Sequence, residues 1–170
     1  MSVLLRSHNP AWARKYQAAY NELRRRLPAD SYAGIEHVGS TAVPGLIAEP
    51  VIDILVGIPT MSTIDQLEPE LVLLEYYPWH SATPGLCYQR RNSLRVPTHR
   101  IHVVVHESPQ WNDQLAVRNR LVHSATDREA YEKAKLELVA QYPESTHYRE
   151  AKAEVIGQLL KKRPTENMLA

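Results

Sequence analysis

The sequence predicts an α+β protein in which a mixed β-sheet is flanked by helices, with the C-terminal helices packed on it. Residues 10–27 have helical periodicity, residues 51–58 and 99–106 read as strands, and residues 111–162 return to helical spacing. Elements in the order helix, strands, helices favour one sheet covered by helices. We expect a single domain over residues 1–163, followed by a tail at 164–170.

The opening helix is predicted from Pro10, with Asn9 as a candidate N-cap, to a stop at Pro28. Three arginines at 24–26 end it, either as a solvated helix terminus or as an anion contact. Apolar residues spaced by three and four form its buried face: Trp12, Tyr16, Ala19, Tyr20, Leu23 and Leu27.

Strands are expected at 32–38, 51–58, 86–91 and 99–106, with a short strand or turn at 76–79 and a loop at 92–98. The run at 51–58 is almost entirely apolar, which is typical of a strand covered on both faces. In 99–106, Ile101, Val103 and Val105 share one face, while Arg100, His102, Val104 and His106 share the other. Helices are expected at about 62–74, 111–123, 127–141 and 145–162, with Thr126 or Asp127 as a cap of the third.

The composition limits the classes of function. The net charge of +1 argues against a strongly basic nucleic-acid binder, and the single cysteine, Cys87, excludes an internal disulfide framework. We expect Cys87 to be a small buried apolar residue. The N-terminus lacks the apolar core of a signal peptide, and no stretch approaches the roughly 18 apolar residues of a membrane span, so we expect a cytoplasmic protein.

The turn Gly39-Ser40-Thr41 is the first candidate for chemistry. Glycine lets a backbone approach a ligand closely, and the two hydroxyls with neighbouring N–H groups are suited to phosphate oxygens. The alternative is an ordinary turn between a strand and a helix, with Ser40 as its cap.

Asp53 is the second candidate, because a carboxylate between Ile52 and Ile54 is costly to bury unless it is paired or bound to a metal. It is expected to face either an internal partner or a metal or substrate. Glu49 lies four residues earlier, about 13 Å away along a strand, so the two acids are not expected to hold one metal ion together.

Histidines and arginines form a third group of candidates. His102 is expected to share a site with His37 and Asp53 if their strands are neighbours, and Arg100 and Arg118 are candidates for receiving phosphate. His102 and His106 are about 13 Å apart on a strand and cannot share a zinc ion. A metal-dependent hydrolase built on His37, His99 and His102 is one alternative.

Several motifs together resemble the GrpB-like family. The stretch HVGSTAVPGLIAEPVIDILV is similar to the family's central signature, H-[IV]-G-S-T-[SA]-V-P-G-L-x-A-K-P-I-I-D-I. HNPAWARKYQAAYNELRRRL resembles its opening helix, HRIHVVV its histidine-containing strand, and YEKAKLELVAQY and YREAKAEVIGQLL its C-terminal Y-x-x-x-K helices. The resemblance extends over nearly the whole chain.

The resemblance implies a nucleotidyltransferase-like fold, a Gly-Ser turn that holds nucleotide phosphates, and strand carboxylates that hold divalent metal. Gly39 and Ser40 match the turn and Asp53 matches one acid, but Val51 and Leu55 stand where a D-x-D partner would be. Glu49 stands where the family's central signature has a lysine. Asn119 stands where the F-R-D motif has its acid.

Two readings follow from this resemblance. The first is a protein that binds a nucleotide or phosphorylated small molecule and carries out metal-dependent transfer of a nucleotidyl or phosphoryl group. There Asp53 and His102 would be catalytic and hold Mg²⁺ or another divalent ion, while His37, Gly39, Ser40, Thr41, Arg100 and Arg118 would bind the substrate. The second is a non-catalytic nucleotide-binding or regulatory module that has lost the carboxylate pair.

Overall fold

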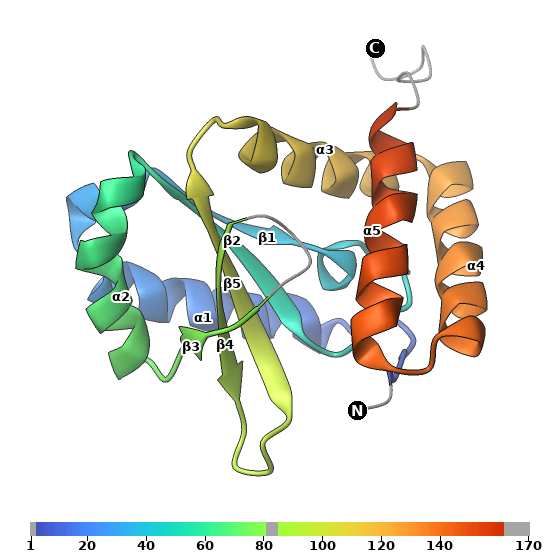
Figure 1. Cartoon of the computed structure of the whole chain (residues 1–170), viewed down its shortest axis with the longest axis horizontal. Helices are drawn as coiled ribbons and strands as arrows, with labels where there is room; N and C mark the ends of the chain where they lie inside the picture. Colours follow the sequence, from blue (N-terminus) through green and yellow to red (C-terminus); the bar gives the residue numbers. More distant parts are fainter. Residues whose placement is uncertain (1–2, 81–84, 162–170) are drawn as a thin grey trace.

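The computed structural model describes residues 3–80 and 85–161, and its centre is a five-stranded sheet in the order β1-β2-β5-β4-β3 (Figure 1). The strands are β1 (Gly34–Val38), β2 (Ile52–Ile58), β3 (Tyr77–Pro78), β4 (Leu86–Arg91) and β5 (Pro97–Val105). β2 and β5 pair in parallel and the other pairs are antiparallel. The predicted mixed sheet is therefore confirmed.

One face of the sheet packs against α1 (Ala11–Arg26) and α2 (Ile64–Leu73). The even-numbered isoleucines and valine of β2 point to this face, together with Ile101 and Val103 of β5, and all of them are buried. The main hydrophobic core therefore lies between these two helices and the sheet, as the alternation of β5 predicted.

The opposite face is covered from one side by α3 (Pro109–His123), whose Trp111 packs on Val38, Leu55 and Val104. Figure 1 shows α4 (Ala125–Gln141) and α5 (Ser145–Lys161) side by side. Both helices pack against α3 and the loop before β2 in a second hydrophobic cluster. The predicted packing of the C-terminal helices is confirmed.

Element boundaries differ from the sequence-based expectation in a few places. β5 begins at Pro97, inside the predicted loop, because it continues pairing with β4 as far as Arg91. α3 begins at Pro109, and Ser108 accepts a hydrogen bond from Trp111 N, so the proline starts this helix. Ser124 caps α4, two residues before Thr126 and three before Asp127, the expected caps. The predicted tail at 164–170 lies outside the described residues.

The turn after β1 brings the chain directly against β2. Gly39 has φ 71° and ψ −174°, and a short 3-10 helix, Ser40–Ala42, follows it. A Cβ atom at Gly39 would lie 2.6 Å from Oδ2 of Asp53, so only glycine fits this close approach. Two residues of α4 hold the loop that follows, because Glu132 accepts from the Ile47 amide and Lys135 donates to the Ile47 carbonyl.

No helix in the described part of the chain is long and apolar enough to cross a bilayer.

Candidate functional site

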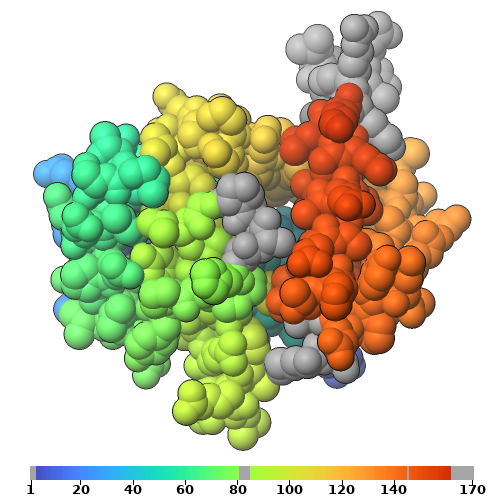
Figure 2. Space-filling view, viewed as in Figure 1, coloured from blue at the N-terminus to red at the C-terminus, as the bar shows by residue number. Residues whose placement is uncertain are grey.

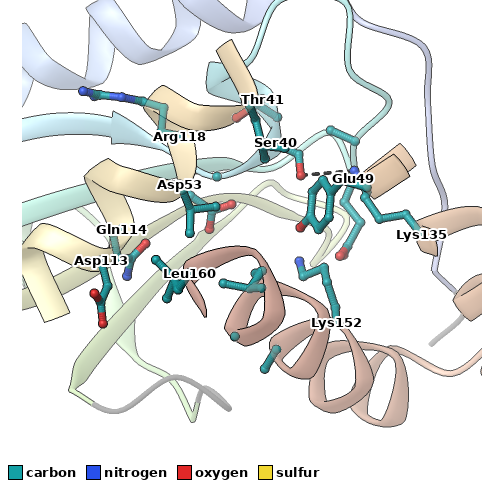
Figure 3. Close-up of a pocket in the computed structure, with 18 of the residues that line it drawn as sticks. Ser40, Thr41, Glu49, Asp53, Asp113, Gln114, Arg118, Lys135, Lys152 and Leu160 are labelled. Carbon is teal, nitrogen blue, oxygen red and sulfur yellow. Dashed lines mark hydrogen bonds between the residues drawn. The ribbon is translucent and has the colours of Figure 1, made fainter. Parts of the chain in front are cut away.

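A cleft of about 480 Å³ opens between the 39–41 turn, the residues leading into β2, and helices α3, α4 and α5. In Figure 2 the corresponding furrow separates α5 from the β4–β5 side of the molecule, with teal atoms deep within it. Figure 3 shows two ends of this cleft, with Ser40, Lys135 and Lys152 at one end and Asp113, Gln114 and Leu160 at the other. Asp53 lies between them.

Ser40 is held by α4. The ammonium group of Lys135 lies 3.1 Å from Ser40 Oγ (Figure 3), and Tyr131, one helical turn earlier, lines the same cleft. Lys135 is only 1% exposed. Burial, reinforced by the charge of Lys152, lowers the pKa of Lys135 to about 7, although Glu49, Glu132 and Asp53 oppose this shift. The 39–41 turn therefore carries a buried cation from a distant helix.

Asp53 is the meeting point of the turn and the sheet. His102 Nε2 donates to its Oδ1 at 3.1 Å, and the Asp53 side chain keeps 21% exposure toward the cleft. Burial raises the pKa of Asp53, but the hydrogen bond from His102 and the charges of Arg100 and Lys152 outweigh burial and lower the pKa to about 2.

His102 lies beneath Asp53, and both of its ring nitrogens are engaged. Nδ1 is 3.3 Å from Cys87 Sγ, so Cys87 is buried as predicted but is a hydrogen-bonding partner as well as an apolar one. Burial lowers the pKa of His102, but its bonds to Asp53 and Cys87 and their charges raise the pKa to about 9. At neutral pH the pair is an imidazolium and a carboxylate.

This pairing predicts an unusual titration of His102. We expect its imidazole ¹H–¹³C NMR signals to titrate near pH 9 in the wild-type protein and below the ordinary 6.5 in Asp53→Asn, where burial dominates. Because the native pKa is raised, its contribution to stability is complete below pH 6.5 and is lost as pH rises through about 9. An unchanged titration in the variant would contradict this assignment.

Two arginines and a tryptophan lie close to Glu49, which lines the cleft. Glu49 Oε2 lies 3.5 Å from Arg100 and 3.9 Å from Arg149, and both guanidinium groups lie over the ring of Trp79, at 5.0 and 5.2 Å. Glu49 does line the same cleft as Asp53, because it precedes β2 and is not on the strand. The extended-strand spacing expected between these acids therefore does not apply.

Lys152 of α5 contributes a further cation, and Figure 3 shows its ammonium group pointing into the cleft. Burial, partly opposed by Glu49 and Asp53, lowers the pKa of Lys152. Two buried donors that line the cleft, Tyr148 Oη and Arg100 Nε, have no hydrogen-bond partner among the described residues. Unpartnered buried donors are uncommon in folded proteins.

Three of the predicted substrate-binding residues have other partners. Thr41 is buried, and its hydroxyl donates to the Val51 carbonyl at 3.4 Å. Arg118 donates to Glu36 and to the His37 carbonyl, and Figure 3 shows it pointing away from Asp53. His37 stacks on Tyr16 of α1, on the far face of the sheet, and burial lowers its pKa to about 4. Thr41 and Arg118 still line the cleft, as Gly39, Ser40, Asp53 and Arg100 do, whereas His37 is not among its lining residues.

The histidine-based hydrolase centre does not form. His99 lies against Tyr76 and Arg90 on the α1 face with His37, whereas His102 points to the opposite face. The parity of a strand explains the separation, because residues 99 and 102 face opposite sides.

Residues 3–80 and 85–161 contain no group of three or more His, Cys, Asp or Glu side chains that could hold a metal ion. One Asp53 oxygen accepts from His102, which is protonated and has no nitrogen free to act as a ligand. Glu49 is occupied by two arginines. These side chains do not fit the two-metal arrangement that the fold implies.

Sequence reasoning missed Lys135 and Lys152, which are 95 and 112 positions from Ser40. A signal was present, because Tyr131 with Lys135 and Tyr148 with Lys152 repeat the pattern Tyr-x-x-x-Lys in consecutive helices. A spacing of four residues places each pair on one face of its helix, and both pairs face the cleft.

The five-stranded mixed sheet, the glycine-serine turn and the flanking helices define a protein of nucleotidyltransferase-like fold. A structure of the Cid1 poly(U) polymerase with Mg 3′-dATP bound superposes with a TM-score of 0.50, over 88% of this chain and 49% of that chain, at 11% identity. This likeness establishes the fold alone.

A family model described as GrpB protein matches residues 2–162, so the chain belongs to the GrpB family. The "Glutamate-rich protein GrpB" of Alkalihalophilus pseudofirmus is 26% identical over 165 residues, covering 93% of this chain and 94% of the relative. The crystal structure of the conserved protein GrpB from Enterococcus faecalis superposes with a TM-score of 0.73 at 23% identity, over 92% of this chain and 99% of that one.

Proposed function

We propose that the cleft binds a nucleotide or another phosphorylated small molecule, and that its own side chains supply the positive charge that a metal would otherwise provide. The observation that carries this proposal is the contact between Lys135 and Ser40, which places a buried cation on the turn. Lys152 and Arg100 line the same end of the cleft. We call Ser40, Arg100, Lys135 and Lys152 the basic end.

The balance of charges supports an anionic ligand. His102 already neutralises Asp53, and Arg100 and Arg149 share Glu49. Glu132 also lies near Lys135, but Lys152 then remains in excess of the nearby carboxylates. Burying two ammonium groups together is unfavourable, and an anion between them would remove that repulsion. Each charge-assisted hydrogen bond to a phosphate oxygen is worth about 1.5–3 kcal/mol.

Binding without group transfer is the function that these residues support. Nucleotidyl transfer by the two-metal route needs carboxylates that hold both ions, and here one carboxylate is paired with an imidazolium. The fold alone favours the second candidate, metal-dependent transfer with Asp53 and His102 as the metal ligands and catalytic groups.

Calorimetric titration with pyrophosphate and the nucleoside triphosphates, in EDTA and in Mg²⁺ or Mn²⁺, separates these functions. We expect binding in EDTA, an affinity that divalent metal does not increase, and no turnover of nucleotide in an assay for released pyrophosphate. Absence of all binding would refute the proposal. Binding that requires metal, accompanied by turnover, would establish the transferase instead.

A further inference from the structure

The cleft continues beyond the basic end, along a stripe of α5. Tyr148, Lys152, Ile156 and Leu160 recur every four residues and all line the cleft, so the stripe changes from polar to apolar along the helix. Figure 3 shows Lys152 and Leu160 at opposite ends of this stripe.

The far part of the cleft has apolar walls from two helices. α3 supplies Val117 and Leu121, while α5 supplies Ala153, Ile156 and Leu160. Leu160 is 37% exposed in the structure, although its neighbour Leu159 is buried at 5%. Polar ligand groups placed between these walls would be desolvated without partners, at a cost of about 1–3 kcal/mol each.

Gly157 also lines the cleft and leaves space beside the apolar part of this stripe. No described atom lies within 4 Å of the position that a Cβ atom would occupy, so close packing does not require the glycine. A glycine inside a helix costs about 1 kcal/mol relative to alanine. Its effect here is to keep the wall of the cleft open.

We infer that the ligand is a phosphate ester whose uncharged body has mostly apolar surface and lies between α3 and α5, with its far end beside Asp113 and Gln114. This inference rests on the proposed function, because it takes the basic end as the phosphate site. The volume of about 480 Å³ is in the range of sites that enclose whole small molecules. A nucleotide and an aryl phosphate share this chemistry.

The test uses calorimetry with four kinds of probe: pyrophosphate, ribose 5-phosphate, nucleoside 5′-monophosphates and 1-naphthyl phosphate. The wild-type protein is expected to bind the nucleotides or naphthyl phosphate about tenfold more tightly than ribose 5-phosphate, a difference of about 1.4 kcal/mol. Tighter binding of the nucleotides alone would identify the ligand as a nucleotide. Tighter binding of both the nucleotides and naphthyl phosphate would identify apolar surface as the determinant of affinity. Either result supports the inference.

Gly157→Leu fills the apolar part and leaves the basic end intact. We expect it to remove the tenfold advantage while pyrophosphate affinity stays within about twofold. Gly157→Ala is the matched control, which keeps the helix and most of the space. Equal affinity for ribose 5-phosphate and the apolar esters, or a variant in which the advantage persists, would overturn this inference alone. Failure of the wild-type protein to bind pyrophosphate or any ester would overturn the proposed function with it.

Discussion

Lys135→Met is expected to weaken the binding of pyrophosphate and nucleotides by about 10- to 100-fold. Lysine and methionine have similar unbranched stems, so the substitution removes the ammonium group with little change in packing. The lost group contacts Ser40 and belongs to the basic end, where a charge-assisted bond is worth about 1.5–3 kcal/mol. Calorimetric titration of pyrophosphate at pH 7 measures the effect directly.

Lys135 also donates to the Ile47 carbonyl, so a control must separate binding from support of the loop. Glu132 also holds Ile47, because its carboxylate accepts a hydrogen bond from the Ile47 amide. Glu132→Ala therefore removes a contact to the same loop residue without removing a cation from the cleft. We expect this variant to retain pyrophosphate affinity within about threefold. An equal loss in both variants would show that Lys135 supports the loop and is not a ligand contact.

The pH dependence gives a second readout for the same lysine. Its pKa of about 7 means that the free protein loses the Lys135 charge as pH rises, while a bound anion favours the charged form. Affinity for pyrophosphate in the wild-type protein should therefore fall between pH 7 and 9, and this slope should be smaller in Lys135→Met. The contribution of Lys135 to stability should instead rise with pH. Its lowered pKa makes the native state bind fewer protons than the unfolded state between pH 7 and 10.5.

The sheet and the turn were predictable because their signals are local. The apolar run of β2 and the alternation of β5 indicated which side chains face α1. The glycine before Ser40 indicated a close backbone approach, although the neighbour in the structure is Asp53 of β2. Asp53 was recognisable for a physical reason, since a carboxylate in an apolar strand needs a partner. His102 is that partner.

The basic end was not predictable in the same way. Lys135 and Lys152 lie on amphipathic helices, where lysine is ordinarily a solvated residue, and only the packing of α4 and α5 beside the turn makes them part of a cleft. Arg118 illustrates how a predicted cleft residue can also have a partner within the chain. It lies on the cleft-lining helix α3, but the nearby Glu36 pairs with it at 2.7 Å. Periodicity places a side chain on a face without identifying its partner.

Asp53→Ala is expected to lower the free energy of unfolding by about 3–5 kcal/mol, the usual cost of removing one partner from a buried ion pair. His102 would remain only 9% exposed and would lose its proton, while Arg100 and Lys152 would lose a nearby negative charge. Urea unfolding at pH 7 measures the change. Asp113→Ala, which removes an exposed carboxylate of α3, is the matched control and should change stability by less than about 0.5 kcal/mol.

A double-mutant cycle tests whether the destabilisation comes from the pair or from lost packing. If the cost of Asp53→Ala comes mainly from leaving the buried His102 imidazole without its partner, then His102→Leu should be less damaging in the Asp53→Ala background than in the wild-type protein. The coupling should reach about 1–3 kcal/mol, as expected for groups in direct contact. Additive effects would mean that the carboxylate is stabilised by Arg100 and Lys152 instead, and the His102 signals would then titrate below pH 6.5 in the wild-type protein, because burial would dominate. Both measurements must agree, because the raised pKa and the coupling energy describe the same interaction.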